Sequence, residues 1–145
     1  MTSPQFESQI RHHLAVHGVR YTRGRQTVVA ALARMDGPRS AAELYDQLER
    51  TLPLSSLYRS LAVLAEAGVL SPHHGTKGLT RYELAEWLMG HHHHLVCIDC
   101  GAVDDVQLPP DLETTLERLV ATVAADRFVA TGHALEIDGR CAACA

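Results

Sequence analysis

The sequence lacks any apolar run longer than a few residues, which excludes a transmembrane helix of about 20 residues. Its beginning, MTSPQFESQIRHH, lacks the apolar segment of a secretory signal, and no H-E-x-x-H metalloprotease motif occurs. The composition, 46% apolar and 21% charged, is typical of a globular protein and excludes collagen, a coiled coil and full disorder. We therefore expect a cytoplasmic protein of one medium domain or two small ones, with no membrane partner.

Lysine is almost absent: the sequence has one lysine, Lys77, and 12 arginines. We attach no function to this bias. The distribution of charge is more informative. Residues 1–60 hold eight arginines and five acidic residues, whereas residues 61–145 hold five basic and twelve acidic residues. A basic half suits a polyanion and an acidic half suits cations, so the two halves are expected to perform two different tasks.

Cysteine is scarce as well, and its four residues form two C-x-x-C pairs separated by 40 residues: Cys97 with Cys100, and Cys141 with Cys144. Two disulfides are not expected in a cytosolic chain. Four thiolates on two tight turns are typical of a tetrahedral structural Zn²⁺ site that joins distant segments. The alternative interpretation is a redox pair or two inert pairs.

The N-terminal half has the pattern of a winged helix-turn-helix over residues 1–85. Apolar spacing predicts helices over 4–17, 24–35, 40–51 and 55–67. Thr22 is the expected N-cap of the second helix, Ser40 and Glu43 form a capping box on the third, and Ser55 is the expected N-cap of the fourth, which stops at Gly68. The segments VLSPHH and LTRYEL flank the turn GTKG, which indicates a β-hairpin.

A linker is expected over residues 86–90, followed by a second domain over residues 91–145. This part shows strand signals around the first C-x-x-C, a helix that starts at Pro109-Pro110, and a strand pair within FVATGHALEIDGRC. Such a small mixed α/β unit has too small a core to be stable without a cross-link, which a bound zinc ion supplies. The predicted fold class is α+β, a winged helix-turn-helix followed by a small zinc-stabilised α/β domain.

The helix SSLYRSLAVLAEAG is the candidate for reading DNA, because the N-terminal end of the second helix of this motif enters the major groove. The residues there are Ser55, Ser56, Tyr58 and Arg59. Arg59 is suited to a bidentate contact with guanine or to a phosphate. Arg20, Arg23 and Arg25 precede the second helix and are candidates for the DNA backbone. The alternative is a solvated arginine face on an ordinary helical domain.

Four consecutive histidines, His91 to His94, lead into the first C-x-x-C. In an extended segment alternate residues face opposite sides, so His91 and His93 are expected at one metal site and His92 and His94 at another. Candidate partners are the acidic residues Glu83, Asp104, Asp105, Glu113 and Glu117, together with His73, His74 and His133. In contrast, His12, His13 and His17 are expected to be ordinary surface or core residues.

Taken together, the motifs RYTRGRQTVV, RSAAELYDQL, SSLYRSLAVLAEAGVL, RYEL, HHHHLVCIDCG and GRCAAC resemble the ferric uptake regulator family of metal-sensing repressors, in the family's order and over most of the chain. The resemblance implies a cytoplasmic homodimer with N-terminal winged helices and C-terminal dimerisation domains. It implies structural Zn²⁺ on the four cysteines. It also implies that metal at the hinge allows both winged helices to meet palindromic double-stranded operator DNA.

The resemblance further implies two regulatory metal sites. Glu83, His92 and His94 match the family's hinge ligands, and Asp105 matches a carboxylate used by some members. His91, His93 and His133 match a second regulatory site that also takes a helix glutamate. The landmark Leu116 favours Glu117 for that role, whereas counting from Cys97 favours Glu113.

The sequence departs from both main subtypes of the family. Pro38 and Arg39 stand where many iron-type members have a histidine, and Ala85 stands where several zinc-type members have a cysteine. His74, or alternatively His73, is the expected replacement ligand. The motifs HHHHLVC and HALEIDGRCAACA look most like zinc uptake regulators, so zinc is favoured over iron or manganese. The competing hypotheses are a zinc-dependent hydrolytic enzyme and a metal storage module, and neither explains the helix-turn-helix.

Overall fold

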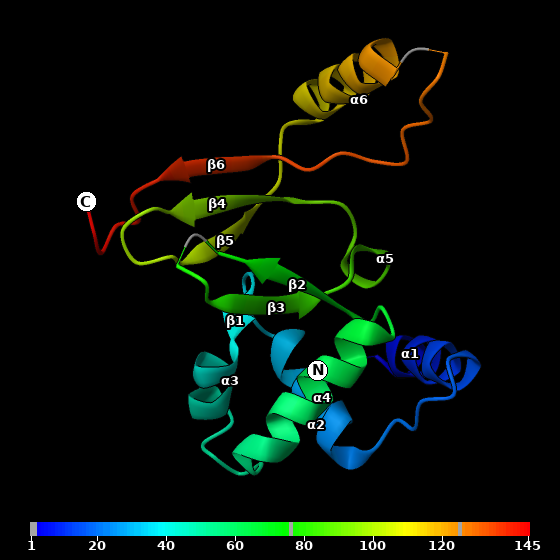
Figure 1. Cartoon of the computed structure of the whole chain (residues 1–145), viewed down its shortest axis with the longest axis vertical. Helices are drawn as coiled ribbons and strands as arrows, with labels where there is room; N and C mark the ends of the chain where they lie inside the picture. The colour runs from blue at the N-terminus through cyan, green and yellow to red at the C-terminus, as the bar shows by residue number, and fades with distance from the viewer. Residues whose placement is uncertain (1–2, 76, 125) are drawn as a thin grey trace. The chain divides into compact units, whose positions relative to one another are not determined.

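The computed structural model describes residues 3–75, 77–124 and 126–145. The chain divides into two compact units, Met1–His91 and His92–Ala145. The first unit holds α1 (Pro4–Val16), α2 (Arg23–Leu32), β1 (Arg39–Ser40), α3 (Ala41–Gln47), α4 (Leu54–Glu66), β2 (Leu70–His74), β3 (Thr80–Leu84) and α5 (Glu86–Met89) (Figure 1). The second holds β4 (His93–Cys97), β5 (Val103–Val106), α6 (Pro110–Ala124) and β6 (Glu136–Gly139). Among the described residues, none of the helices has the length and apolar character that crossing a bilayer requires.

Local capping explains where the first helices begin. The hydroxyl of Thr22 accepts a hydrogen bond from the Arg25 amide, which confirms Thr22 as the N-cap of α2. At α3 the Ser40 hydroxyl accepts from the Glu43 amide at 3.2 Å, while the Glu43 carboxylate accepts from the Ser40 amide at 2.7 Å. The predicted capping box is therefore confirmed, and two amide groups that the helix itself cannot pair are satisfied.

The second helix ends at Leu32 rather than near residue 35, and two further predicted boundaries are wrong for local reasons. The third helix ends at Gln47 rather than near residue 51, because Glu49 and Arg50 adopt left-handed backbone conformations with φ of 50° and 58°. The fourth helix begins at Leu54, with Pro53 in the N-cap position at φ −53° and ψ 138°. Ser55 is consequently inside the first helical turn and does not cap it.

The core of the first unit is formed by one apolar stripe from each of the larger helices. Val28 and Leu32 of α2 and Leu57, Leu61 and Leu64 of α4 are almost completely buried. The sheet order is β1-β3-β2, and the β2–β3 hairpin pairs Leu70 with Leu84 and His74 with Thr80. The hairpin predicted on either side of GTKG is thus confirmed, and the first unit has the winged helix-turn-helix architecture.

The segment expected as a linker is helical. Residues Glu86–Met89 form the single turn α5, and Leu88 packs against the core of the first unit. The short apolar sequence EWLM carries too few residues for helical periodicity to appear, so sequence pattern alone does not predict this turn. Gly90, with φ of 86°, follows it in a conformation that favours glycine.

The second unit is a three-stranded sheet in the order β5-β4-β6 with α6 in the connection between β5 and β6 (Figure 1). β4 pairs antiparallel with β5 and parallel with β6. The helix predicted from Pro109-Pro110 is confirmed. The tail forms one strand rather than the expected pair, because β6 takes its hydrogen-bonding partner from β4, far back in the sequence, and not from the residues just before it.

Candidate metal centres

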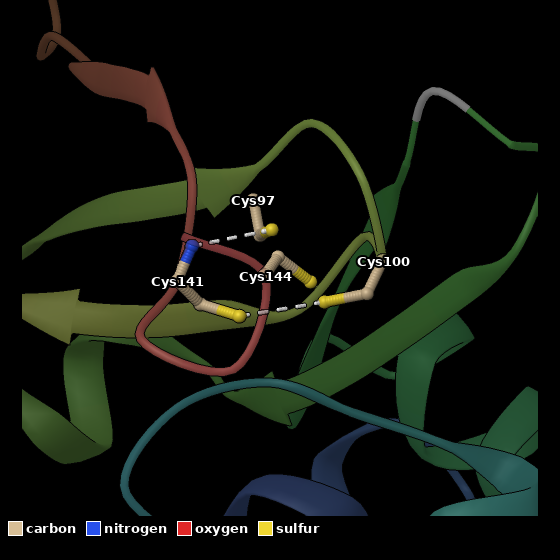
Figure 2. Close-up of side chains that lie close together, drawn as sticks. All are labelled: Cys97, Cys100, Cys141 and Cys144. Carbon is tan, nitrogen blue, oxygen red and sulfur yellow. Dashed lines mark hydrogen bonds between the residues drawn. The ribbon is translucent and has the colours of Figure 1, made fainter.

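The four cysteines meet at one end of the second sheet. Cys97 ends β4, where the Gly101 amide donates to the Cys97 carbonyl at 2.8 Å and closes the first turn. Cys141 and Cys144 follow β6, and the Cys144 amide donates to the Cys141 carbonyl at 2.9 Å. Because β4 and β6 pair with Cys97 opposite Gly139, the two turns lie side by side (Figure 2). Parallel pairing therefore brings together sulfurs that are some 40 residues apart in sequence.

The sulfur geometry suits a tetrahedral cation. All four Sγ atoms lie within 4.8 Å of one another, and Cys100 Sγ lies 3.8 Å from Cys141 Sγ. A tetrahedron with Zn–S bonds of about 2.3 Å has edges of about 3.8 Å. All four cysteines are free thiols. A metal site requires this, whereas a disulfide framework would have paired them. The donor set and its spacing therefore suit Zn²⁺.

Backbone amides favour the charged form of one of these sulfurs. Hydrogen bonds from the amides of Cys100 and Cys141 lower the pKa of Cys97 to about 6; the Cys141 amide lies 3.3 Å from the sulfur. Hydrogen bonds with the thiols of Cys141 and Cys100 raise the pKa of Cys144 to about 12. The first thiolate is thus prepared by the backbone, while near neutral pH the thiol form of Cys144 is favoured until a cation replaces its proton.

A second group in this unit joins the sheet to α6. Glu113 lies in the first turn of α6, and its two carboxylate oxygens approach two imidazoles: His93 Nε2 at 2.9 Å and His133 Nε2 at 2.8 Å. The two rings stack with centroids 5.2 Å apart, and His93 is almost completely buried. Glu117 lies one turn further along α6, exposed and without an ion pair in the part of the chain that the structure describes. Glu113 is therefore the helix carboxylate that the fold brings to these histidines.

A third group stands on the other side of the histidine run. His94 of β4 is paired in register with Asp105 of β5. The Nε2 atoms of His92 and His94 each lie 3.7 Å from Asp105 Oδ1, and the two rings meet edge to face at 5.1 Å. The expected alternation thus separates His93 from His92 and His94. Two imidazoles and one carboxylate converge here, a donor set suited to a divalent first-row metal.

The first unit carries the remaining predicted hinge ligands on its hairpin. Oε1 of Glu83, on β3, lies 2.5 Å from Nε2 of His73, on β2, and the two atoms form a hydrogen bond. His74 turns to the opposite face of the hairpin, where its Nδ1 lies 3.3 Å from Thr80 Oγ1. The structure therefore places His73, and not His74, beside Glu83.

Two further contacts were not anticipated from the sequence. His91 Nδ1 pairs with Glu86 Oε1 of α5. His13, expected to be an ordinary residue, stacks on the ring of Trp87 with centroids 4.7 Å apart. Strand parity was the available signal for His73, since residues 73 and 83 share a face once the hairpin register is known. No comparable signal marks Glu86 or Trp87, because both depend on the formation of α5.

The predicted DNA-facing residues lie at the exposed N-terminal end of α4 and around the start of α2, where Arg23 and Arg25 are in the first helical turn rather than ahead of the helix as expected. Tyr58 is 54% exposed and Leu54, at the start of the helix, is 43% exposed. Arg59 and Ser55 are also exposed, whereas Ser56 is partly covered. Arg20 and Arg23 are exposed, but the Arg25 guanidinium donates to the Arg20 carbonyl. Arg25 thus supports the loop that presents Arg20, which is a different use from a direct phosphate contact.

Comparison with known proteins gives a consistent result. The model of the ferric uptake regulator family matches residues 16–137. The chain is 34% identical over 135 residues to the zinc uptake regulation protein of Mycobacterium tuberculosis, covering 90% of this chain and 98% of that one. It is 33% identical over 124 residues to the ferric uptake regulation protein of Bacillus subtilis, covering 81% and 79%. The crystal structure of the Vibrio cholerae ferric uptake regulator matches with a TM-score of 0.70 at 29% identity, over 90% of this chain and 98% of that one.

These relatives are transcription regulators, so the hypothesis of a hydrolytic zinc enzyme is not supported. The family match covers the winged helix, the histidine run and the first cysteine pair. The protein is a member of the ferric uptake regulator family of metal-responsive transcription regulators, and it is not an enzyme.

Proposed function

We propose that this protein is a metal-dependent repressor that binds palindromic operator DNA as a homodimer in the cytoplasm, with zinc as the favoured regulatory metal. One observation carries the proposal. A single small sheet gathers a four-thiol group and two imidazole–carboxylate groups, in a chain whose other unit is a winged helix-turn-helix. Neither catalysis nor storage accounts for that combination.

The four cysteines are assigned to structural Zn²⁺. Their sulfurs lie within 4.8 Å of one another, and the four thiols are the only cysteines of the chain. When bound, the cation neutralises the thiolates and joins the end of β4 to the C-terminal turn. The binding free energy of such a site is also folding free energy for a small unit.

The hinge site is assigned to Glu83, His92, His94 and Asp105, with His73 in place of His74. His92, His94 and Asp105 converge within the second unit, and Glu83 with His73 forms a two-donor group on the hairpin of the first. A metal held by ligands from both units restrains their relative orientation. DNA then selects from fewer arrangements, and the apparent operator affinity rises.

The second regulatory site is assigned to His91, His93, His133 and Glu113. Glu113 already approaches both His93 and His133, which supports it over Glu117. Because Glu113 belongs to α6, this site also connects the sheet to that helix.

Operator binding is assigned to α4 through Arg59, Tyr58, Ser55 and Ser56, with Arg20 and Arg23 on the phosphate backbone. The exposed N-terminal end of a helix with a fully buried opposite face supports this assignment. Two copies related by two-fold symmetry would place two such helices on the half-sites of a palindrome.

Zinc is favoured because the zinc uptake regulation protein of Mycobacterium tuberculosis matches nearly the full length of both chains. The ferric uptake regulation protein of Bacillus subtilis matches at similar identity over a smaller share of both chains. The Vibrio cholerae ferric uptake regulator, however, matches over equally large shares, which leaves iron and manganese as the competing metals.

The test is an operator-binding titration of the protein, with its structural zinc in place, against free Zn²⁺, Fe²⁺ and Mn²⁺. We expect tightening by zinc at the lowest free concentration. Arg59→Ala is expected to lose about 1–3 kcal/mol of operator binding if Arg59 reads a base, while retaining its metal content. Metal binding without any operator binding would favour a storage module instead.

A further inference from the structure

The short helix α5 is attached to the C-terminal end of α4. The Trp87 indole Nε1 donates to the Gly68 carbonyl at 2.8 Å. The same indole stacks on the His13 ring at an interplanar angle of 29°, and His13 Nε2 lies 2.6 Å from the Ala67 carbonyl. Ala67 and Gly68 terminate α4, so three side-chain contacts converge where that helix ends.

Backbone contacts strengthen the attachment. The Ala85 amide donates to the Val69 carbonyl at 2.9 Å, and Leu88 packs against the core. The Gly90 amide donates to the Glu86 carbonyl at 2.7 Å and closes the turn. Residues 85–89 are therefore held to the end of α4 by both backbone and side-chain contacts.

The same helix also holds a predicted metal ligand. Glu86 opens α5, and its Oε1 contacts Nδ1 of His91. An imidazole that donates its Nδ1 proton to a carboxylate presents Nε2 as its ligand atom, with its orientation set and its basicity raised. The Glu86 carboxylate therefore contacts His91 in the way that a supporting carboxylate commonly contacts a metal-ligating histidine.

We propose that α5 couples the second regulatory metal to the DNA-reading helix, with Glu86 and Trp87 as positioning residues at its two contacts. This inference rests on the proposed function for the assignment of His91 as a ligand and of α4 as the helix that reads operator DNA. Glu86 sets the His91 ring, and Trp87 with His13 passes a displacement of α5 to Ala67 and Gly68. Because α4 is a stiff rod about 20 Å long, a tilt at its C-terminal end also moves its N-terminal end.

Trp87 is the only tryptophan, so its fluorescence reports on α5 directly. Protein with structural zinc is titrated with Zn²⁺ while bound metal is counted by equilibrium dialysis. We expect a change in Trp87 emission as the second site fills. The change should be absent from His91→Ala, which keeps the hinge ligands and separates the two sites.

Glu86→Ala is the decisive variant. It should bind the second metal about 10-fold more weakly or worse, and at saturating metal it should show no emission change. Met89→Ala on the same helix, where the side chain is half exposed, is the matched control and should behave like the parent. An emission change that persists in Glu86→Ala with metal bound would overturn the coupling.

Trp87→Phe tests the contact with α4, because it keeps an aromatic ring for His13 but has no donor for the Gly68 carbonyl. In the parent, filling the second site should tighten operator binding about 5-fold or more. In Trp87→Phe that factor should fall to about 1, while the affinity for the second metal is retained. The double variant with Glu86→Ala should lose no more of this metal-dependent tightening of operator binding than either single variant.

The outcomes separate the two proposals. If the parent binds a second metal but its Trp87 emission does not respond, α5 is not the coupling element and the proposed function stands. If Trp87→Phe responds to metal as the parent does, the coupling is likewise wrong. If dialysis finds no metal that depends on His91, the second site of the proposed function is wrong and the coupling falls with it.

Discussion

At the scale of single residues, Glu43 links the helix-turn-helix to the wing. One of its oxygens accepts from the Ser40 amide and from the Arg81 guanidinium, each at 2.7 Å. Arg81 is only 6% exposed and belongs to β3, two residues before Glu83. Partial burial disfavours the Glu43 carboxylate, but the Ser40 amide and Arg81 outweigh it and hold the pKa of Glu43 below its usual value.

Glu43→Gln should destabilise the protein by about 1–2 kcal/mol, because it leaves a buried guanidinium without its countercharge. The loss of stability should lie at the low end of this range, because the Glu43 side chain is 44% exposed. A lowered pKa contributes stability above the ordinary glutamate value, so the difference should persist down to about pH 5 and shrink at lower pH, as the parent takes up its proton. Urea unfolding at several pH values measures this, with exposed Glu66→Gln as the control. An equal loss of unfolding free energy in Glu66→Gln would contradict the assignment of this stability to the contact between Glu43 and Arg81.

The four thiols provide a second prediction at this scale. In metal-free protein the first thiolate should appear near pH 6, from Cys97, and the last near pH 12, from Cys144. The Cys97 thiolate stabilises the fold above the ordinary thiol pKa, and this contribution is lost as the pH falls through about 6. Ultraviolet absorbance of thiolate measures the steps, and Cys97→Ser should remove the first. Four thiols that titrate together would show that the backbone amides do not prepare the site.

At the scale of elements, α6 has an apolar stripe without a cover in the single chain. Leu112, Leu119 and Val123 are 50%, 54% and 69% exposed, and with Leu116 they recur at heptad spacing. None of the described residues of this helix is buried. A helix with this pattern is stable when its stripe packs against another surface, and a second copy of the chain is the partner that the family assignment favours.

Leu119→Glu should therefore convert the proposed dimer into monomers, because it places a charge in the centre of the stripe. Sedimentation measures the change, and operator binding should weaken with it. Ala121→Glu places the same charge on the opposite side of α6 and should leave the dimer intact. A dimeric Leu119→Glu protein would place the subunit contact elsewhere.

At the scale of the whole molecule, the proposed hinge ligands are divided between two units. Glu83 and His73 belong to the hairpin of the first, whereas His92, His94 and Asp105 belong to the second. In the proposed function, occupancy of this site narrows the range of orientations offered to DNA. By linkage, operator DNA must tighten metal binding by the same factor.

His92→Ala should keep the structural zinc and the dimer but lose the response of operator binding to metal. Acid near pH 6 should act in the same direction, because a protonated imidazole cannot ligate a metal. Operator affinity measured against free Zn²⁺ tests both, with His12→Ala on the exposed face of α1 as the control. If His92→Ala titrates like the parent, the switch lies at His91, His93 and His133.

Features that depend on neighbouring residues followed directly from the sequence. The Thr22 cap and the Ser40–Glu43 capping box were predicted because each bond closes within one helical turn. The cysteine turns were recognised because two residues between cysteines place both sulfurs on one side of a turn. The apolar stripes of α4 and α6 were visible because helical periodicity extends over several turns.

Tertiary structure decided the features that depend on register and packing. His73 rather than His74 faces Glu83 because the hairpin register, not the residue type, sets which side chains share a face. Glu113 rather than Glu117 approaches His93 because the phase of α6 over the sheet selects one turn of the helix. Trp87 and Glu86 acquired roles only when the end of α4 offered a carbonyl and α5 formed on it. Local hydrogen bonding is encoded within a turn, whereas these choices arise from contacts between residues far apart in the chain.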